Sequence, residues 1–316
     1  MIRVEDLKKY FGPKKAVDGV SFTVNKGEVL GFLGPNGAGK STTMRMITGF
    51  IPPTEGRVTV GGFDMANEPL KAKALIGYLP ESAPAYAEMS VEKFLGFVAE
   101  LRGLRGAEKK AAVERVIEMC FLRSVAHQSV DTLSKGYKHR TCFAQSIVHD
   151  PEVLIMDEPT EGLDPNQKHE VRTLIRRMGQ TKAIIFSTHI LEEVEAVCSR
   201  AIIIDRGHIV ANGTPAELKQ RSEQAGAVRV RLANGDASVA DKLARLELAA
   251  RVVRLDGAVS ALRVFPKDRS ASSALARAIG DLASRENWIV EELYGEEGRL
   301  DDVFRAITLP DTRQAA

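Results

Sequence analysis

Residues 28–41 read Glu-Val-Leu-Gly-Phe-Leu-Gly-Pro-Asn-Gly-Ala-Gly-Lys-Ser, and this stretch decides the fold. Its second half fits the pattern G-x-x-x-x-G-K-[ST], in which a glycine-rich loop turns successive backbone N–H groups toward one anion. The Lys40 ammonium adds a positive charge near the β- and γ-phosphates, and the Ser41 hydroxyl suits Mg²⁺. The apolar residues 29–33 predict a strand, and Ser41–Ile47 predicts a helix whose free N–H groups face the same phosphates. The stretch therefore predicts a nucleoside triphosphate site.

The composition is that of an ordinary globular protein. The chain has 316 residues, enough for two domains, and its net charge of +2 shows no bias toward a polyanionic partner. Cys120, Cys142 and Cys198 are far apart and form no metal-binding spacing, so we expect buried thiols in a reducing compartment. Residues 1–6 lack the apolar region of a secretory signal, and no apolar run approaches the ~20 residues that cross a bilayer. If the protein acts at a membrane, we therefore expect it to do so through another chain.

The first part of the chain, to about residue 215, alternates strand-like and helix-like segments. This alternation predicts an α/β layer architecture with parallel strands. Glu92–Leu101 and Ala107–Cys120 have helical spacing, so we expect a helical insert over about residues 82–150. The predicted strands are Ile2–Val4, Val20–Val24, Val29–Leu33, Arg57–Val60, Ile76–Leu79, Val153–Asp157, Ala183–Ser187 and Ala201–Asp205.

The last third of the chain has a different texture. Its elements follow the order βαββαβ of a ferredoxin-like unit, with a short closing helix at Arg299–Ile307. We therefore expect a first domain over residues 1–220, an α+β accessory domain without a recognisable site over 221–309, and a loose tail over 310–316. The predicted elements are strand Ala227–Leu232, helix Ser238–Leu246, strands Ala250–Leu255 and Val259–Phe265, helix Ala271–Arg285 and strand Trp288–Leu293.

Two acids follow a continuously apolar strand at residues 153–156. An acid at such a strand end, opposite a phosphate loop, can hold Mg²⁺ directly or through water, and this is the role that we assign to Asp157. Glu158 comes next and points elsewhere, so it is suited to deprotonate the water that attacks the γ-phosphate. The alternative is a pair of solvated acids at a strand end, which the phosphate loop upstream makes less favourable.

A second helix start in the chain is also suited to an anion. Leu133–Tyr137 precedes the helical run Lys138–Val148, with Ser134 as an N-cap and Gly136 permitting close backbone approach. Many helices begin with serine and bind nothing. Because this segment lies just before the acidic strand, we favour an anion-binding role for it.

These motifs, in this order and spacing, resemble those of ABC ATPases. The match includes the glycine-rich loop, the Leu-Ser-x-Gly word, the strand ending in two acids, the turn Gly162–Asp164 and His189 after the next strand. It covers about Met1–Leu218 and looks closest to ATP-binding subunits of bacterial ABC-2-type exporters, including the gliding-motility and drug- or antibiotic-resistance groups. The ending Leu300–Phe304 resembles the C-terminal domain that many of those subunits carry. The resemblance implies a P-loop NTPase core of the ABC type that hydrolyses ATP with Mg²⁺.

The resemblance also implies roles for single residues. Glu158 resembles the catalytic glutamate, and His189 the switch histidine that senses the γ-phosphate. Ser134 and Gly136 match the signature that closes over ATP bound to another subunit, and Asp164 matches the loop that links the two sites. The nucleotide contacts of the phosphate loop are Gly34, Asn36, Gly37, Ala38, Gly39, Lys40, Ser41 and Thr42, and the metal-side residues are Ser41, Glu81 and Asp157.

Some positions leave alternatives open or depart from the family pattern. Phe11 is the ring on which adenine stacks by alignment to the following glycine, with Tyr10 as the close alternative. Glu81 stands where the family usually has glutamine; a carboxylate still suits Mg²⁺ but adds negative charge beside the γ-phosphate. The signature has Lys135 and Tyr137 where glycine and glutamine are most common, and we expect binding to survive.

We therefore expect the cytoplasmic ATPase subunit of an ABC transporter, an exporter rather than an importer. It acts as a head-to-tail homodimer, since two phosphate-directed helix starts serve one ligand best when they come from different subunits. A separate transmembrane permease docks beside Glu81 and residues 82–102 and holds the dimer on the inner face of the membrane. A soluble ABC ATPase acting on ribosomes or DNA is the first alternative, but one ATPase domain, no heptad run and near-neutral charge disfavour it. A nucleotide-gated regulator is the second, disfavoured by the presence of both Glu158 and His189.

Overall fold

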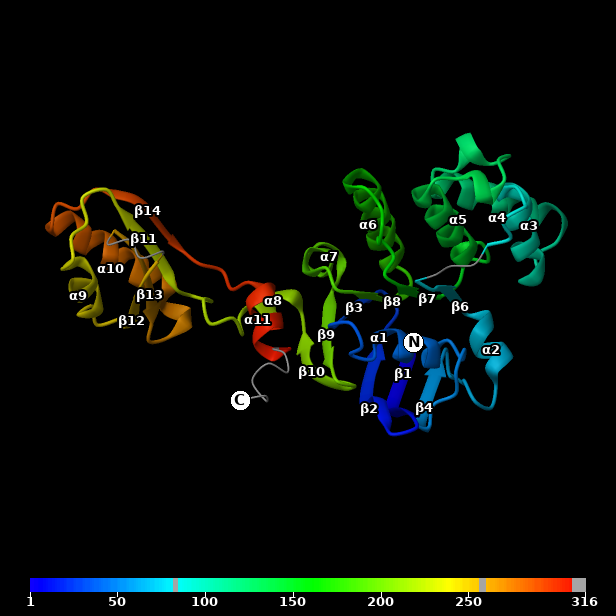
Figure 1. Ribbon diagram of the computed structural model, residues 1–316, viewed down its shortest axis with the longest axis horizontal. Coiled ribbons are helices and arrows are strands. Elements are labelled where there is room, and N and C mark those ends of the chain that lie inside the picture. Colours follow the sequence, from blue (N-terminus) through cyan, green and yellow to red (C-terminus); the bar gives the residue numbers. More distant parts are fainter. Residues whose placement is uncertain (82–84, 256–259, 309–316) are drawn as a thin grey trace. The chain divides into compact units, whose positions relative to one another are not determined.

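The structure is a computed structural model that describes residues 1–81, 85–255 and 260–308. It divides into two compact units, Met1–Pro215 and Ala216–Ala316, close to the domain boundary that we expected near residue 220. The tail predicted over 310–316 and the first residues of the predicted insert lie outside the described residues. Figure 1 shows the elements of both units, each of which is described by itself below.

The first unit is built on a sheet with the strand order β10-β9-β3-β8-β7-β6. Neighbouring strands from β9 to β6 run parallel, and β10 is antiparallel to β9. The register pairs Leu33 with Thr188 and Asp157 with Ser187, so the carboxyl ends of β3, β7 and β8 meet at one edge. The strands are β3 (Val29–Leu33), β6 (Ile76–Leu79), β7 (Val153–Asp157), β8 (Ala183–Thr188), β9 (Arg200–Asp205) and β10 (His208–Gly213).

A second, antiparallel sheet of order β2-β1-β4-β5 lies in the same unit. Its first two strands extend well beyond the segments that we predicted, because their outer halves pair through polar residues such as Tyr10 with Lys15. The strands are β1 (Ile2–Phe11), β2 (Lys14–Val24), β4 (Glu55–Val60) and β5 (Phe63–Asp64).

Two hydrophobic cores fix the parallel sheet between its layers. On one face, Leu154 and Phe186 pack with apolar residues of helices α3 (Val91–Leu101), α4 (Gly106–Met119), α5 (Lys135–Ile147) and α6 (Pro165–Gly179). On the other face, Phe32 and Ile155 pack with α1 (Lys40–Ile47) and with the antiparallel sheet. Figure 1 shows α5 and α6 on one side of the parallel strands and α1, β1, β2 and β4 on the other. Because both faces of the parallel sheet are covered, the residues at its strand ends are the ones that can reach a ligand.

The helices agree with the predictions where we made them. The insert contains α3 (Val91–Leu101), α4 (Gly106–Met119) and α5 (Lys135–Ile147). Helix α5 begins three residues before the predicted Lys138, because the Ser134 hydroxyl accepts a hydrogen bond from the Tyr137 N–H (3.4 Å) and caps the helix there. The other helices of the unit are α1 (Lys40–Ile47), α2 (Pro69–Ala74), α6 (Pro165–Gly179) and α7 (Leu191–Val197).

The second unit confirms the predicted order βαββαβ. Its sheet has the order β12-β13-β11-β14, antiparallel throughout, and α9 and α10 pack on one face against Val230, Leu262 and Val264. This is the ferredoxin-like arrangement. The elements are α8 (Pro215–Lys219), β11 (Val228–Leu232), α9 (Val239–Ala244), β12 (Ala249–Arg254), β13 (Ala261–Pro266), α10 (Ser272–Arg285), β14 (Val290–Gly295) and α11 (Leu300–Ile307). Across the described part of both units, no helix is long and apolar enough to span a bilayer.

Candidate active site

The loop between β3 and α1 has the geometry that its sequence predicts. Gly39 has φ 108°, and a Cβ at this position would lie 2.5 Å from the Ala16 carbonyl oxygen, so only glycine fits. Helix α1 starts directly after it at Lys40, without a side-chain cap. Its first N–H groups are therefore left to an anion in the loop.

Lys40 is buried in this loop. Its Nζ donates hydrogen bonds to the carbonyl oxygens of Gly34 (2.7 Å) and Pro35 (3.2 Å). Burial lowers the pKa of Lys40, while the negative charges of Glu158, Asp157 and Glu81 oppose that shift. The ammonium is thus held at the loop, within electrostatic reach of three carboxyl groups.

The two acids at the end of β7 point in different directions. Asp157 is 1% exposed and accepts a hydrogen bond from the Ser187 hydroxyl on the neighbouring strand. Glu158 has φ 51°, which is uncommon for a residue other than glycine. Its N–H group donates to the Ser187 carbonyl and hydroxyl oxygens, both at 3.2 Å, and these bonds hold the backbone in that conformation.

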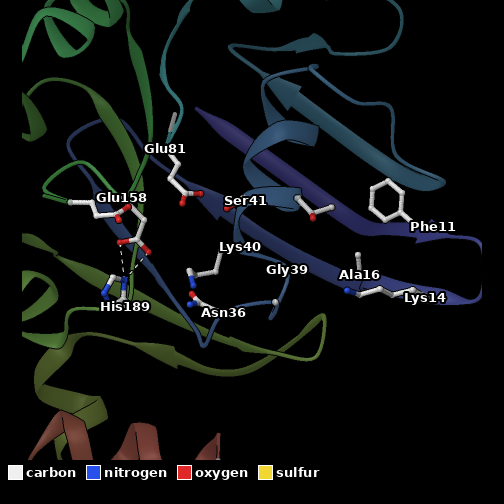
Figure 2. Close-up of a pocket in the computed structure, with 13 residues that line it drawn as sticks. Phe11, Lys14, Ala16, Asn36, Gly39, Lys40, Ser41, Glu81, Glu158 and His189 are labelled. Carbon is white, nitrogen blue, oxygen red and sulfur yellow. Dashed lines mark hydrogen bonds and ion pairs between the residues drawn. The ribbon is translucent and has the colours of Figure 1, made fainter. Parts of the chain in front are cut away.

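Glu158 and His189 form a pair at the ends of β7 and β8. The Nδ1 atom of His189 lies 3.1 Å from both carboxylate oxygens of Glu158, as the dashed lines in Figure 2 show. A carboxylate accepts hydrogen bonds, so Nδ1 carries the hydrogen and the Nε2 side of the ring is left for another group. Burial raises the pKa of Glu158, and the hydrogen bond from His189 partly offsets this rise.

A pocket of about 590 Å³ joins these groups. Phe11, Lys14 and Ala16 lie at one end of it, and Glu158 and His189 lie at the other, beyond the phosphate loop (Figure 2). The Tyr10 hydroxyl, by contrast, donates to Asp18 (2.9 Å), and Tyr10 does not line the pocket. The other lining residues are Asn36, Gly37, Gly39, Lys40, Ser41, Thr42, Glu81 and Glu161.

Several residues that we predicted for the site do not line this pocket. Gly34, Ala38 and Asp157 are buried beside it. Ser134 caps α5, and Asp164 caps α6 by accepting a hydrogen bond from the Gln167 N–H (2.9 Å). Gly136 lies against the Gln167 side chain, since a Cβ on Gly136 would be 2.4 Å from its Oε1. The signature residues Ser134 and Gly136 and the loop at Asp164 therefore lie next to each other. They do not line the pocket that contains the phosphate loop of their own chain.

Three lining residues were not predicted from the sequence: Lys14, Ala16 and Glu161. Glu161 lies between Glu158 and the turn Gly162–Asp164, both of which belong to the family resemblance, and this position was a usable signal. Lys14 and Ala16 stand at the start of β2 and reach the pocket through the pairing of β2 with β1, which no local pattern indicates.

The oxygen atoms in and beside the pocket suit a magnesium ion that is bound together with phosphates. Ser41 and Glu81 line the pocket and Asp157 is buried beside it, and they offer hydroxyl and carboxylate oxygens, the ligands that Mg²⁺ prefers. Among the described residues, no group of three or more His, Cys, Asp or Glu side chains could hold a metal ion. Mg²⁺ commonly takes one or two protein ligands and completes its shell with phosphate and water. The residues present fit that mode of binding.

Comparisons with known proteins match this arrangement. A family model described as "ABC transporter" matches residues 17–161. The linearmycin resistance ATP-binding protein LnrL of Bacillus subtilis is 40% identical over 222 residues, covering 70% of this chain and 71% of its own. The solved ATP-binding subunit of an ABC transporter is 29% identical with a TM-score of 0.65, covering 70% of this chain and 92% of its own. A dimeric ATP-binding cassette in a post-hydrolysis state bound to ADP and Pi is 21% identical with a TM-score of 0.64. This match covers 68% of our chain and 99% of the cassette, and it shows that the two share a fold.

Proposed function

The chain belongs to the ABC transporter family, and from that premise we propose that it hydrolyses ATP as a dimer to drive export through a separate membrane permease. Family membership makes it an ATP-binding subunit of the kind found in export and resistance systems. The single observation that supports the residue assignments is the Glu158–His189 pair, which faces Lys40 and the phosphate loop within one pocket.

The pocket suggests how ATP is held. The Phe11 ring, half exposed at one end of the pocket, offers an apolar face for adenine. The loop from Asn36 to Thr42 receives the phosphates, with N–H groups at the start of α1 directed toward them. Lys40 exchanges its bonds to two loop carbonyls for bonds to phosphate oxygens, which are charged and therefore stronger acceptors.

Hydrolysis follows from the opposite end of the pocket. Glu158 orients a water molecule and accepts its proton, and its raised pKa brings it closer to the pH at which a general base works best. His189 holds the Glu158 carboxylate through Nδ1 and turns Nε2 toward the γ-phosphate. Ser41, Asp157 and Glu81 would hold Mg²⁺, which would supply positive charge to neutralise the β- and γ-phosphates.

A second copy of the chain completes the site. Ser134 and Gly136 start a helix suited to a phosphate but line no part of their own chain's pocket. We assign them to the γ-phosphate bound by the other subunit of a head-to-tail dimer. Asp164, which caps the neighbouring helix α6, links this surface to the loop that carries Glu158.

ATP shifts the dimer between open and closed states only through contacts that it makes better in the closed state. The phosphates bridge the loop of one subunit and the signature of the other, and this bridge exists only when the dimer is closed. We propose that a permease docked beside Glu81 and the helical insert is moved by this cycle. That docking places the protein on the cytoplasmic face of the membrane.

The Glu158→Gln variant tests the proposal because it keeps the size of the side chain but cannot accept the proton. We expect ATPase activity to fall about a hundredfold or more, and Mg-ATP to trap a dimer that light scattering detects. If the Glu158→Gln variant keeps its ATPase activity, Glu158 is not the general base. A variant that stays monomeric with Mg-ATP, alone and with its permease, would overturn the shared site.

A further inference from the structure

Glu193 connects the two loops that carry Glu158 and His189. It lies on α7, four residues after His189, and is 1% exposed. Each of its carboxylate oxygens faces one loop. Oε1 accepts a hydrogen bond from the Thr160 hydroxyl, and Oε2 accepts one from the Thr188 hydroxyl (2.8 Å).

The two threonines are themselves buried and stand next to the catalytic pair. Thr160 is two residues after Glu158, in the turn that follows β7. Thr188 is the last residue of β8 and directly precedes His189. The Thr188 hydroxyl also accepts a hydrogen bond from the Ile190 N–H (3.0 Å), which fixes the backbone on both sides of the histidine.

A buried carboxylate is costly unless it is well paired. Besides the two hydroxyl groups, Glu193 has an ion pair with the Arg172 guanidinium on α6, whose Nη2 lies 3.6 Å from Oε1. This ion pair is long, and the Arg172 Nε has no hydrogen-bond partner among the described residues. An apolar side chain would fill this place in α7 with less desolvation cost. The carboxylate is therefore better explained by the two hydroxyl groups that it holds than by packing alone.

We propose that Glu193 is a positioning residue for hydrolysis: its carboxylate ties the turn after β7 to the end of β8, so that His189 Nδ1 stays at 3.1 Å from Glu158. This inference rests on the proposed roles of Glu158 and His189. It adds a residue that touches neither nucleotide nor water and acts through the two residues that do.

The role predicts a particular kinetic effect. In Glu193→Gln one acceptor oxygen becomes an NH₂ donor, so one threonine hydroxyl must accept a hydrogen bond instead of donating one, and both bonds lose the charged acceptor. The link between the loops is weakened, and small misplacements at a reacting centre cost large factors in rate. We expect kcat to fall about tenfold while KM for ATP changes less than about twofold, because the phosphate loop and Phe11 are untouched.

The experiment compares Glu193→Gln with Glu192→Gln, which changes the same residue type at the exposed neighbouring position of α7. Steady-state kinetics give kcat and KM, and the ¹⁵N signals of His189, assigned with a His189→Ala variant, report its hydrogen bonding. We expect only Glu193→Gln to lower kcat and to shift the His189 signals. Equal effects of the two variants, or an unshifted His189 with a lowered kcat, would overturn the positioning role.

A double-mutant cycle separates positioning from general destabilisation. If Glu193 acts through the pair, then Glu193→Gln lowers the residual kcat of His189→Ala by less than about twofold, compared with about tenfold in the wild-type background. A full tenfold loss in both backgrounds would show an independent, structural effect. If His189→Ala and Glu158→Gln leave the ATPase rate unchanged, the proposed function fails. If His189→Ala and Glu158→Gln abolish ATPase activity but Glu193→Gln does not lower the ATPase rate, only the inference about Glu193 fails.

Discussion

The two units of the chain contain similar charged residues but use them differently. In the first unit, Lys40, Glu158 and His189 face one pocket. In the second unit, charges pair with each other on the sheet: Arg229 and Arg231 both contact Glu292 (3.2 and 3.3 Å), and Arg263 binds Glu296 through two nitrogens. These paired charges offer no reactive group, and the more exposed pairs with Glu292 contribute little energy.

Topology explains the difference. Parallel strands end at the same edge, so residues that follow β3, β7 and β8 converge even though they are far apart in the sequence. In the antiparallel sheet of the second unit, neighbouring strands end at opposite edges, and charged side chains pair across the strands. Convergence at strand ends, and not the number of charges, distinguishes the unit that does chemistry.

The largest effect that we predict is for Lys40→Met. This change removes the positive charge at the phosphates, and ATPase activity should fall about a thousandfold. Lys242→Met is the matched control, because Lys242 forms an ion pair with Glu286 in the second unit. It should leave the steady-state ATPase rate unchanged. Comparable losses in both variants would erase the distinction between the units.

The next effect concerns pH. Burial raises the pKa of Glu158, and His189 lowers it, so kcat of the wild type should decrease as the pH falls through a value above that of an ordinary glutamate, ~4.3. In His189→Ala the lowering contribution is lost. The acidic limb should therefore move to higher pH, with kcat reduced about a hundredfold at its plateau. Rates measured from about pH 4.5 to 8 test this, and a limb that stays or moves to lower pH contradicts the pairing.

The smallest effect on activity is expected in the second unit. Arg263→Ala leaves the half-buried Glu296 without its partner and should destabilise that unit by about 1–2 kcal/mol. Trp288, the single tryptophan of the chain, packs against the core of this unit, so its fluorescence during urea unfolding reports the change. The exposed Arg277→Ala variant should change stability by less than about 0.5 kcal/mol. The ATPase rate of both should equal that of the wild type, and a lost rate in Arg263→Ala would indicate coupling between the units.

The local motifs were predictable from the sequence because their conformation depends on adjacent residues. The strand, glycine loop and helix around Lys40 follow from one short pattern, and so do the apolar strands before Asp157 and Thr188. The order βαββαβ was also predictable, because the spacing of apolar residues in each segment indicates either a strand or a helix. The separate roles of Glu158 and His189 came from the family resemblance. Their hydrogen bond was not predicted, since nothing in the residues themselves sets their distance.

The remaining features depend on contacts between distant segments. Strand β10 (His208–Gly213) was missed because its apolar and polar residues do not alternate, and it becomes a strand only by pairing with the edge of β9. Lys14 and Ala16 enter the pocket through the register of β2 on β1. In the sequence Glu193 is one of three acids within residues 192–195 and was not singled out, because its role depends on two threonines from separate loops.

The central claim is that two chains share each ATP, and mixing two inactive variants tests it most directly. Lys40→Met disables the phosphate loop, and Ser134→Asp keeps a good N-cap for α5 while placing a negative charge at the partner's γ-phosphate. Each variant alone should lose at least about a hundredfold of the ATPase rate. A mixed dimer retains one site with an intact loop and an intact signature, so we predict that the mixture hydrolyses ATP well above the sum of its parts. A Ser134→Asp chain that is fully active alone, or a mixture that forms mixed dimers yet stays inactive, would contradict the shared site.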